Sequence, residues 1–116
     1  HILVSEFTAA SLDSRFFLRE LDLVQVKGKD QAVTLYELVG WKAHLSPKII
    51  QGCALFGKAI GAYRLQQWDR ARSLVAQSLD RMPNDGPSNL YLQRIQQMEA
   101  HPPGENWSGV TVFDHK

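Results

Sequence analysis

The sequence has little cysteine, no long apolar run and almost no net charge, and each absence excludes a class of protein. Its single cysteine, Cys53, rules out an internal disulfide framework and favours a reducing compartment. No apolar run approaches the ~20 residues of a membrane-spanning helix. The opening residues HILVSEFTAASL lack the basic part and the long apolar part of a signal peptide. We therefore expect a cytoplasmic segment that makes no membrane contact itself, any membrane anchor belonging to upstream domains.

Charge and motif content exclude several further functions. The net charge is +1, which gives no overall attraction for nucleic acid. His1, His44, His101 and His115 occur singly and lack the spacing of a metal site such as HExxH. GxSxG, a Walker-type glycine loop and CxxC are absent. The sequence thus predicts no metal ligands and no nucleic-acid partner, and it favours a buried rather than a nucleophilic Cys53.

Residues 1–40 have the pattern of β-structure. ILVS indicates a short strand, and the next residues indicate a short helix or turn with Ser5 or Thr8 as N-cap. Two strand-like apolar runs follow, at residues 16–26 and 33–38. Their alternation is imperfect, because neighbouring apolar residues place apolar groups on both faces. Burial on both faces is typical of a strand inside a covered sheet.

The turn between the two runs reads KGKDQA. Gly28 suits a backbone with positive φ, and Asp30 suits a local hydrogen bond to the backbone. A lone two-stranded hairpin is marginal in water, so we expect further strands or helices to pack on this one.

From Ser46 to about Ala100 the pattern is helical. Ser46 followed by Pro47 has the form of an N-cap and a first helical residue. One helix face carries apolar residues at spacings of three and four, namely Ile49, Cys53, Phe56, Ile60 and Tyr63. A second helix and, after PNDGPS, a third show similar stripes. The tail NWSGVTVFDHK indicates a short strand that pairs with another, anchored by Trp107. The sequence predicts an α+β protein.

Residues 52–99 resemble the tetratricopeptide repeat, a helix–turn–helix unit of about 34 residues. The resemblance rests on small, aromatic and helix-ending positions, namely Ala59, Tyr63-Arg64-Leu65, QQWDRA, Ala71, Leu79 and Pro83. One full repeat and the first helix of another fit. Because about three repeats are normally needed for stability, we expect this segment to lean on the hairpin as a structural appendage.

Residues 1–40 resemble the C-terminal end of the catalytic domain of bacterial class III adenylate/guanylate cyclases. ILVSEFT is similar to the strand and turn that follow the last large catalytic helix of the family, and RELDLVQVKGKDQAVTLYEL is similar to its closing hairpin. Many bacterial members look similar beyond that domain, with a degenerate helical repeat and a W-x-G-V strand. The resemblance implies a cyclase end at 1–40 and a tetratricopeptide-like extension with a terminal strand at 41–116.

The resemblance also implies roles for the turn. Lys27 would bind the polyphosphate of a nucleoside triphosphate and stabilise the leaving pyrophosphate. Gly28 would let the backbone approach the phosphates, and Lys29 would add positive field. The alternative, that both lysines are solvated turn residues, stays open at this point.

The two metal-binding aspartates and the Asn/Arg pair of the family would lie upstream of His1. Mg²⁺ or Mn²⁺ is therefore expected in the intact parent enzyme and none in this segment, which we expect to be inactive alone. The implied partners are the upstream remainder of the catalytic domain and a second copy in a homodimer. The alternative function is a small tetratricopeptide-like protein-interaction module with a purely structural hairpin.

Overall fold

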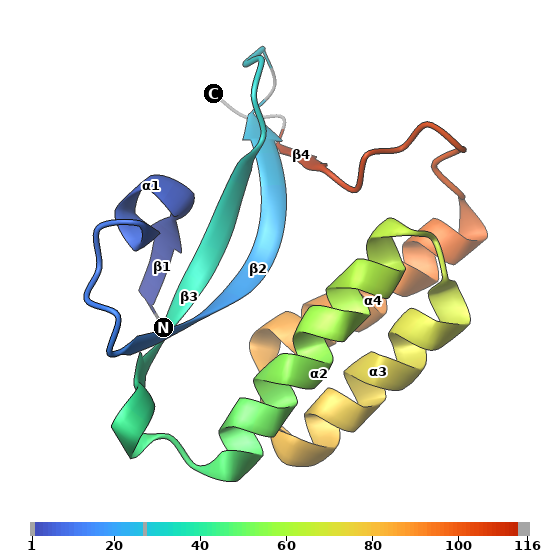
Figure 1. The fold of residues 1–116 in the computed structure, drawn as a ribbon. Helices are drawn as coiled ribbons and strands as arrows, with labels where there is room; N and C mark the ends of the chain where they lie inside the picture. Colours follow the sequence, from blue (N-terminus) through green and yellow to red (C-terminus); the bar gives the residue numbers. More distant parts are fainter. Residues whose placement is uncertain (1, 27, 114–116) are drawn as a thin grey trace. The chain divides into compact units, whose positions relative to one another are not determined.

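The computed structural model describes residues 2–26 and 28–113 of the chain (Figure 1). It confirms the α+β class. The elements are, in order, β1 (Ile2–Ser5), α1 (Glu6–Ala9), β2 (Phe16–Val26), β3 (Val33–Trp41), the 3-10 helix η1 (Lys42–His44), α2 (Pro47–Arg64), α3 (Trp68–Arg81), α4 (Gly86–Ala100) and β4 (Thr111–Phe113).

The chain divides into two compact units. A sheet unit comprises residues 1–45 and 110–116, and a helical unit comprises residues 46–109. The expected boundary between the two segments lies between residues 40 and 41, and the terminal strand was expected to belong with the helices. The structure instead groups that strand with the sheet unit, because β4 pairs with β2. The identities suggested for the two segments stay predictions.

The sheet has the strand order β1-β3-β2-β4. β2 and β3 form the predicted antiparallel hairpin, and β1 pairs antiparallel with β3. The tail strand pairs with β2 in the parallel sense, Val24 lying opposite Thr111 (Figure 1). The outer edges of the hairpin are thus covered by short strands of the same chain, as the marginal stability of a lone hairpin requires.

β2 departs from a regular ladder at two places. Its register against β3 shifts between Phe17 and Leu18 and again between Glu20 and Asp22. At the first shift the extra residue, Val39, lies on β3, and at the second the extra residue, Leu21, lies on β2. An extra residue of this kind bends the strand and increases its local twist.

Polar groups are buried in the sheet alongside apolar ones. Arg19 and Glu37 lie directly opposite each other on β2 and β3, and both side chains are buried. The Nε of Arg19 donates to Oε1 of Glu37 at 2.8 Å, and its Nη2 lies 2.7 Å from the same oxygen. The buried Asp22 accepts hydrogen bonds from the Leu23 backbone N–H at 2.9 Å and from the Thr111 hydroxyl at 3.0 Å. Asp22 therefore ties β4 to β2.

The helical unit has the predicted helices and the predicted Ser46 cap, and a further cap is formed by Asp85. The Ser46 hydroxyl accepts a hydrogen bond from the Ile49 backbone N–H at 3.3 Å, and the Asp85 carboxylate caps α4 by accepting from the Ser88 backbone N–H at 3.2 Å. The core is formed by apolar residues at the predicted spacings, including Phe56, Ala59, Ile60, Tyr63, Ala71, Val75, Tyr91 and Ile95. Cys53 is buried as expected.

The segment before β4 is anchored on the helical unit. The ring of Trp107 lies edge-on to Tyr63, with centroids 5.2 Å apart. Gly109 has a φ of +84°, and a Cβ there would lie 2.6 Å from Cγ of Arg64. Trp107 is therefore the anchor that the sequence indicates. Trp41, at the end of β3, is 40% exposed.

Candidate phosphate-binding turn

The turn from residue 27 to residue 32 joins β2 to β3 and contains the three residues singled out from the sequence. Lys27 lies outside the residues that the structure describes, so its predicted catalytic and phosphate-binding roles stay predictions. Gly28 has a φ of +90°, and a Cβ there would meet no heavy atom within 4 Å. The glycine is thus required by the backbone conformation and not by lack of space.

Lys29 is exposed, and its backbone is held from within the hairpin. Its carbonyl oxygen accepts a hydrogen bond from the side-chain amide of Gln25 at 2.5 Å. We expected the Asp30 side chain to make a local hydrogen bond to the backbone of the turn. In the described part of the chain the Gln25 side chain makes such a bond instead, and the sequence did not single out Gln25. A polar side chain four residues before Lys29, near the end of a strand, was the available signal.

A hollow of about 520 Å³ lies beside the turn. It is lined mainly by apolar side chains with one cation and one carboxylate at the turn, namely Phe7, Val24, Lys29, Asp30, Gln31 and Val33. Phe7 of α1 borders this hollow. α1 is held against β3 because Oε1 of Glu6 accepts a hydrogen bond from the Thr34 backbone N–H at 2.7 Å. The Lys29 ammonium can neutralise part of a phosphate charge here, whereas the Asp30 carboxylate opposes it.

The aspartates of the sheet unit do not converge. Asp13 is paired with Arg15 at 2.7 Å, Asp22 ties β4 to β2, and Asp30 lies at the turn. Among residues 2–26 and 28–113, no group of three or more His, Cys, Asp or Glu side chains is placed to hold a metal ion. No helix of the same residues is long and apolar enough to cross a bilayer.

Comparisons with known proteins give one informative relative. No family model and no solved structure matches the chain. Over 103 residues the chain is 31% identical to a Dictyostelium discoideum protein named adenylate cyclase, terminal-differentiation specific. The match covers 83% of this chain and 5% of that protein, so the chain spans a small part of the relative's length.

The match extends over both compact units of the chain. Because 103 residues exceed the length of either compact unit, the similarity includes residues of both the sheet unit and the helical unit. The chain is thus similar to a region of an adenylate cyclase. The relative comes from Dictyostelium, and the bacterial origin, the class III assignment and the C-terminal position of the segment stay predictions.

Proposed function

We propose that this chain is part of a class III nucleotide cyclase, which converts ATP or GTP into a cyclic nucleotide and pyrophosphate. The observation that carries the proposal is the 31% identity to an adenylate cyclase, which extends over most of the chain. The lysine–glycine–lysine turn adds a physical reason. Its glycine adopts a positive φ, which lets the backbone approach a ligand at the tip of the hairpin.

In this proposal the turn stabilises the charge of the leaving group. The 3′-hydroxyl of the ribose loses its proton to water and its oxygen attacks the α-phosphorus. The bond from that phosphorus to the oxygen that bridges it to the β-phosphorus breaks, and pyrophosphate leaves with the bonding electrons. The Lys27 ammonium would bind the polyphosphate and follow that developing charge. Lys29 would strengthen the local positive field. The Gln25 side chain would hold the turn in shape through its bond to the Lys29 carbonyl.

The remaining catalytic groups are assigned to the parent enzyme and not to this segment. Two metal ions, Mg²⁺ or Mn²⁺, would be held there by two aspartates and would supply Lewis-acid chemistry. The separate environments of Asp13, Asp22 and Asp30 support this assignment, because the described residues contain no group of three or more His, Cys, Asp or Glu side chains placed to hold a metal ion. We therefore propose that the segment alone does not cyclise nucleotides.

The apolar surface of the sheet unit supports incorporation into a larger fold. Ile2 and Leu3 on β1 are 58% and 60% exposed, and Phe7 on α1 is 68% exposed. Ile2 and Leu3 are consecutive on β1 and so lie on opposite faces of the strand. Exposed large apolar side chains of this kind are often covered by other protein surfaces. In the proposal, the upstream remainder of the catalytic domain covers these side chains, and the parent acts as a homodimer.

The experiment that tests the proposal is to read the coding sequence upstream of His1 through about 150 codons, the length of one typical domain. We expect an open frame with two strand-borne aspartates followed by a helix containing Asn-x-x-x-Arg. An unrelated sequence in that frame would contradict the proposal. The helical unit would then be better explained as a tetratricopeptide-like interaction module.

A further inference from the structure

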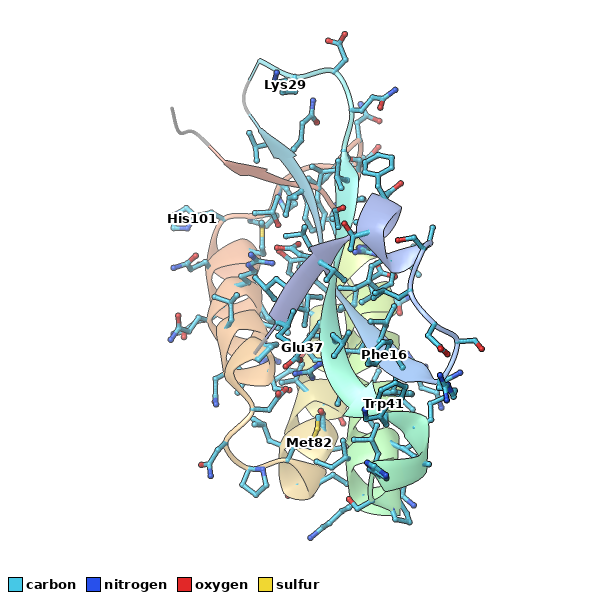
Figure 2. All side chains as sticks on the ribbon, turned by 90° about the vertical axis from the view of Figure 1, so that its left-hand side faces the viewer. Phe16, Lys29, Glu37, Trp41, Met82 and His101 are labelled. Carbon is cyan, nitrogen blue, oxygen red and sulfur yellow. The ribbon has the colours of Figure 1, made fainter. Side chains whose placement is uncertain are left out.

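A second hollow lies at the end of the hairpin opposite the lysine turn. It has a volume of about 440 Å³ and lies within the sheet unit, lined by Ser14, Arg15, Trp41, Lys42, Ala43 and His44. Pockets for small molecules have volumes of roughly 300–1,000 Å³. Figure 2 shows Lys29 at the turn, and Phe16 and Trp41 beside each other toward the other end of the hairpin. Since β2 has 11 residues, the two ends are about 30 Å apart.

Trp41 forms a fixed aromatic wall of this hollow. Its ring stacks on Phe16 with the centroids 4.3 Å apart and the planes inclined by 22°. The guanidinium carbon of Arg15 lies 5.2 Å from the indole centroid. The Lys42 backbone N–H donates to the Arg15 carbonyl oxygen at 2.8 Å, which joins the two chain segments. Trp41 nevertheless stays 40% exposed, so stacking inside the protein leaves much of its surface available to a ligand.

The same hollow has a surplus of positive charge. The cations Arg15 and Lys42 line it together with the imidazole of His44, and none of the described residues that line it carries a carboxylate. In the described ranges, Asp13 is the acid bonded to this cluster, and neither Lys42 nor His44 forms an ion pair. The hydrogen bonds from Arg15 lower the pKa of Asp13, and those bonds raise the pKa of Arg15. One charge pair is thus balanced, and Lys42 remains as an excess cation.

Arg15 is held in a geometry suited to an oxyanion. Its Nε donates to both oxygens of Asp13 at 3.1 and 3.2 Å, and its Nη2 donates to Oδ2 at 2.7 Å. Nη1 takes no part in these bonds. A guanidinium fixed by one carboxylate and by an aromatic ring loses little further freedom when it binds another anion.

From these observations we infer that the hollow around Trp41 binds a small aromatic phosphate. The planar ring of the ligand would contact the exposed part of the Trp41 indole. Its phosphate would lie between the Arg15 guanidinium and the Lys42 ammonium, with His44 at the margin. Aromatic contact and two cations acting together favour a ligand that carries both groups over one that carries either alone. The inference does not depend on the proposed cyclase function, because the hollow is remote from the turn.

The test is an NMR titration of the intact 116-residue chain with 1-naphthyl phosphate as the probe. Two matched probes, inorganic phosphate and 1-naphthol, carry only the anion or only the ring. We expect 1-naphthyl phosphate to shift the Trp41 indole N–H resonance and the backbone resonances of residues 42–44 in a saturable manner. Trp41→Phe identifies the indole resonance. The affinity for 1-naphthyl phosphate should exceed the affinity for either matched probe by about tenfold, and it should fall as salt is added.

Three variants separate the site from general surface charge. Arg15→Gln should weaken binding of 1-naphthyl phosphate about tenfold, and Lys42→Gln by about threefold to tenfold, because each removes one charge-assisted contact. Lys58→Gln is the matched control, since Lys58 is an exposed lysine of the helical unit, and it should leave the affinity unchanged. Backbone spectra of the variants show whether each stays folded.

Four results would overturn the inference. Equal shifts with inorganic phosphate would show an anion site without aromatic selection, and equal shifts with 1-naphthol would show an apolar site without charge. Loss of binding in Lys29→Gln but not in Lys42→Gln would move the ligand to the turn. A phosphotyrosine peptide that binds more than about tenfold tighter than 1-naphthyl phosphate would indicate a protein partner.

Discussion

Arg19 and Glu37 place opposite charges inside the sheet unit, directly across β2 and β3. Both side chains are only 6% and 7% exposed. A buried ion pair has a high desolvation cost, and its two charges depend on each other for compensation. Loss of one partner should therefore lower the free energy of unfolding more than loss of both partners does.

Replacement of Glu37 alone tests that dependence. We expect Glu37→Ala to lower the free energy of unfolding by about 3 kcal/mol or more, because the buried Arg19 guanidinium loses the carboxylate that it faces across the two strands. Urea denaturation followed by circular dichroism measures the change. The control is Arg19→Met combined with Glu37→Leu, which removes both charges and should cost much less. A Glu37→Ala loss below about 1 kcal/mol, the level of an exposed pair, would contradict this expectation.

Glycines give a second test at the residue scale. Gly57 lies within α2, and a Cβ there meets no heavy atom within 4 Å. Gly57→Ala should raise the free energy of unfolding by about 0.5–1 kcal/mol. Gly28 is equally uncrowded but has a φ of +90°. Gly28→Ala should therefore lower the same quantity by about 1–2 kcal/mol, the cost of a left-handed L-residue.

The same urea experiment compares the two glycine variants with the unchanged chain. Space around the added methyl group is equal at both positions, so the sign of the effect reports the backbone conformation alone. If Gly28→Ala proved as stabilising as Gly57→Ala, the turn would not have the positive φ on which its proposed approach to phosphate depends.

Among the elements, β4 is the one whose attachment depends on few contacts. It has three residues, and it pairs with β2 alone. The Thr111 hydroxyl adds a hydrogen bond of 3.0 Å to the buried Asp22 carboxylate. Removal of a donor from a buried carboxylate costs about 1–3 kcal/mol.

Thr111→Val should therefore detach β4 more often, while the shape and β-propensity of the side chain are kept. We expect hydrogen exchange of the β4 amides to become at least about fivefold faster, the factor that corresponds to roughly 1 kcal/mol. Thr111→Ser keeps the hydroxyl and should exchange nearly as the unchanged chain does. If the β4 amides of Thr111→Val exchanged as slowly as those of the unchanged chain, backbone pairing alone would hold the strand.

The elements also show how far the sequence could predict this structure. Helix periodicity and the Ser46 cap are local signals, so the helices and their starts could be read directly. The partner of β4 could not, because Thr111 and Val24 are far apart in the sequence and no local signal joins them. The Arg19–Glu37 pair was equally hidden, since charged residues in a strand normally indicate a solvent face. The exposure of Trp41 could not be predicted either, because aromatic side chains are usually buried in the protein core.

The candidate site was predictable in part for the same reason. A glycine between two lysines at a hairpin tip is a local pattern, and the positive φ of Gly28 follows from it. The roles given to Lys27 and Lys29 come from a resemblance to cyclases and involve groups outside this chain. The hollow around Trp41 has no sequence motif, because it joins residues 14–15, which precede β2, to residues 41–44, at and after the end of β3.

For the whole molecule, two compact units share one relative. The match to an adenylate cyclase spans both, which favours a segment that is inherited as one piece. The helical unit has its own caps and aromatic core and so can serve as a structural extension. The sheet unit leaves apolar side chains of β1 and α1 exposed, which supports the proposal that further protein surface covers them.

The most direct test of the proposed function is the effect of Lys27→Ala on cyclic nucleotide formation. It is measured with ATP and with GTP, in the presence of Mg²⁺ or Mn²⁺, in the polypeptide that joins this chain to its upstream coding sequence. We predict a fall in turnover of about 100-fold or more, the size of effect seen when one charge-stabilising donor is removed. Lys58→Ala should leave turnover unchanged. Full turnover in Lys27→Ala would contradict the phosphate-binding role of this turn.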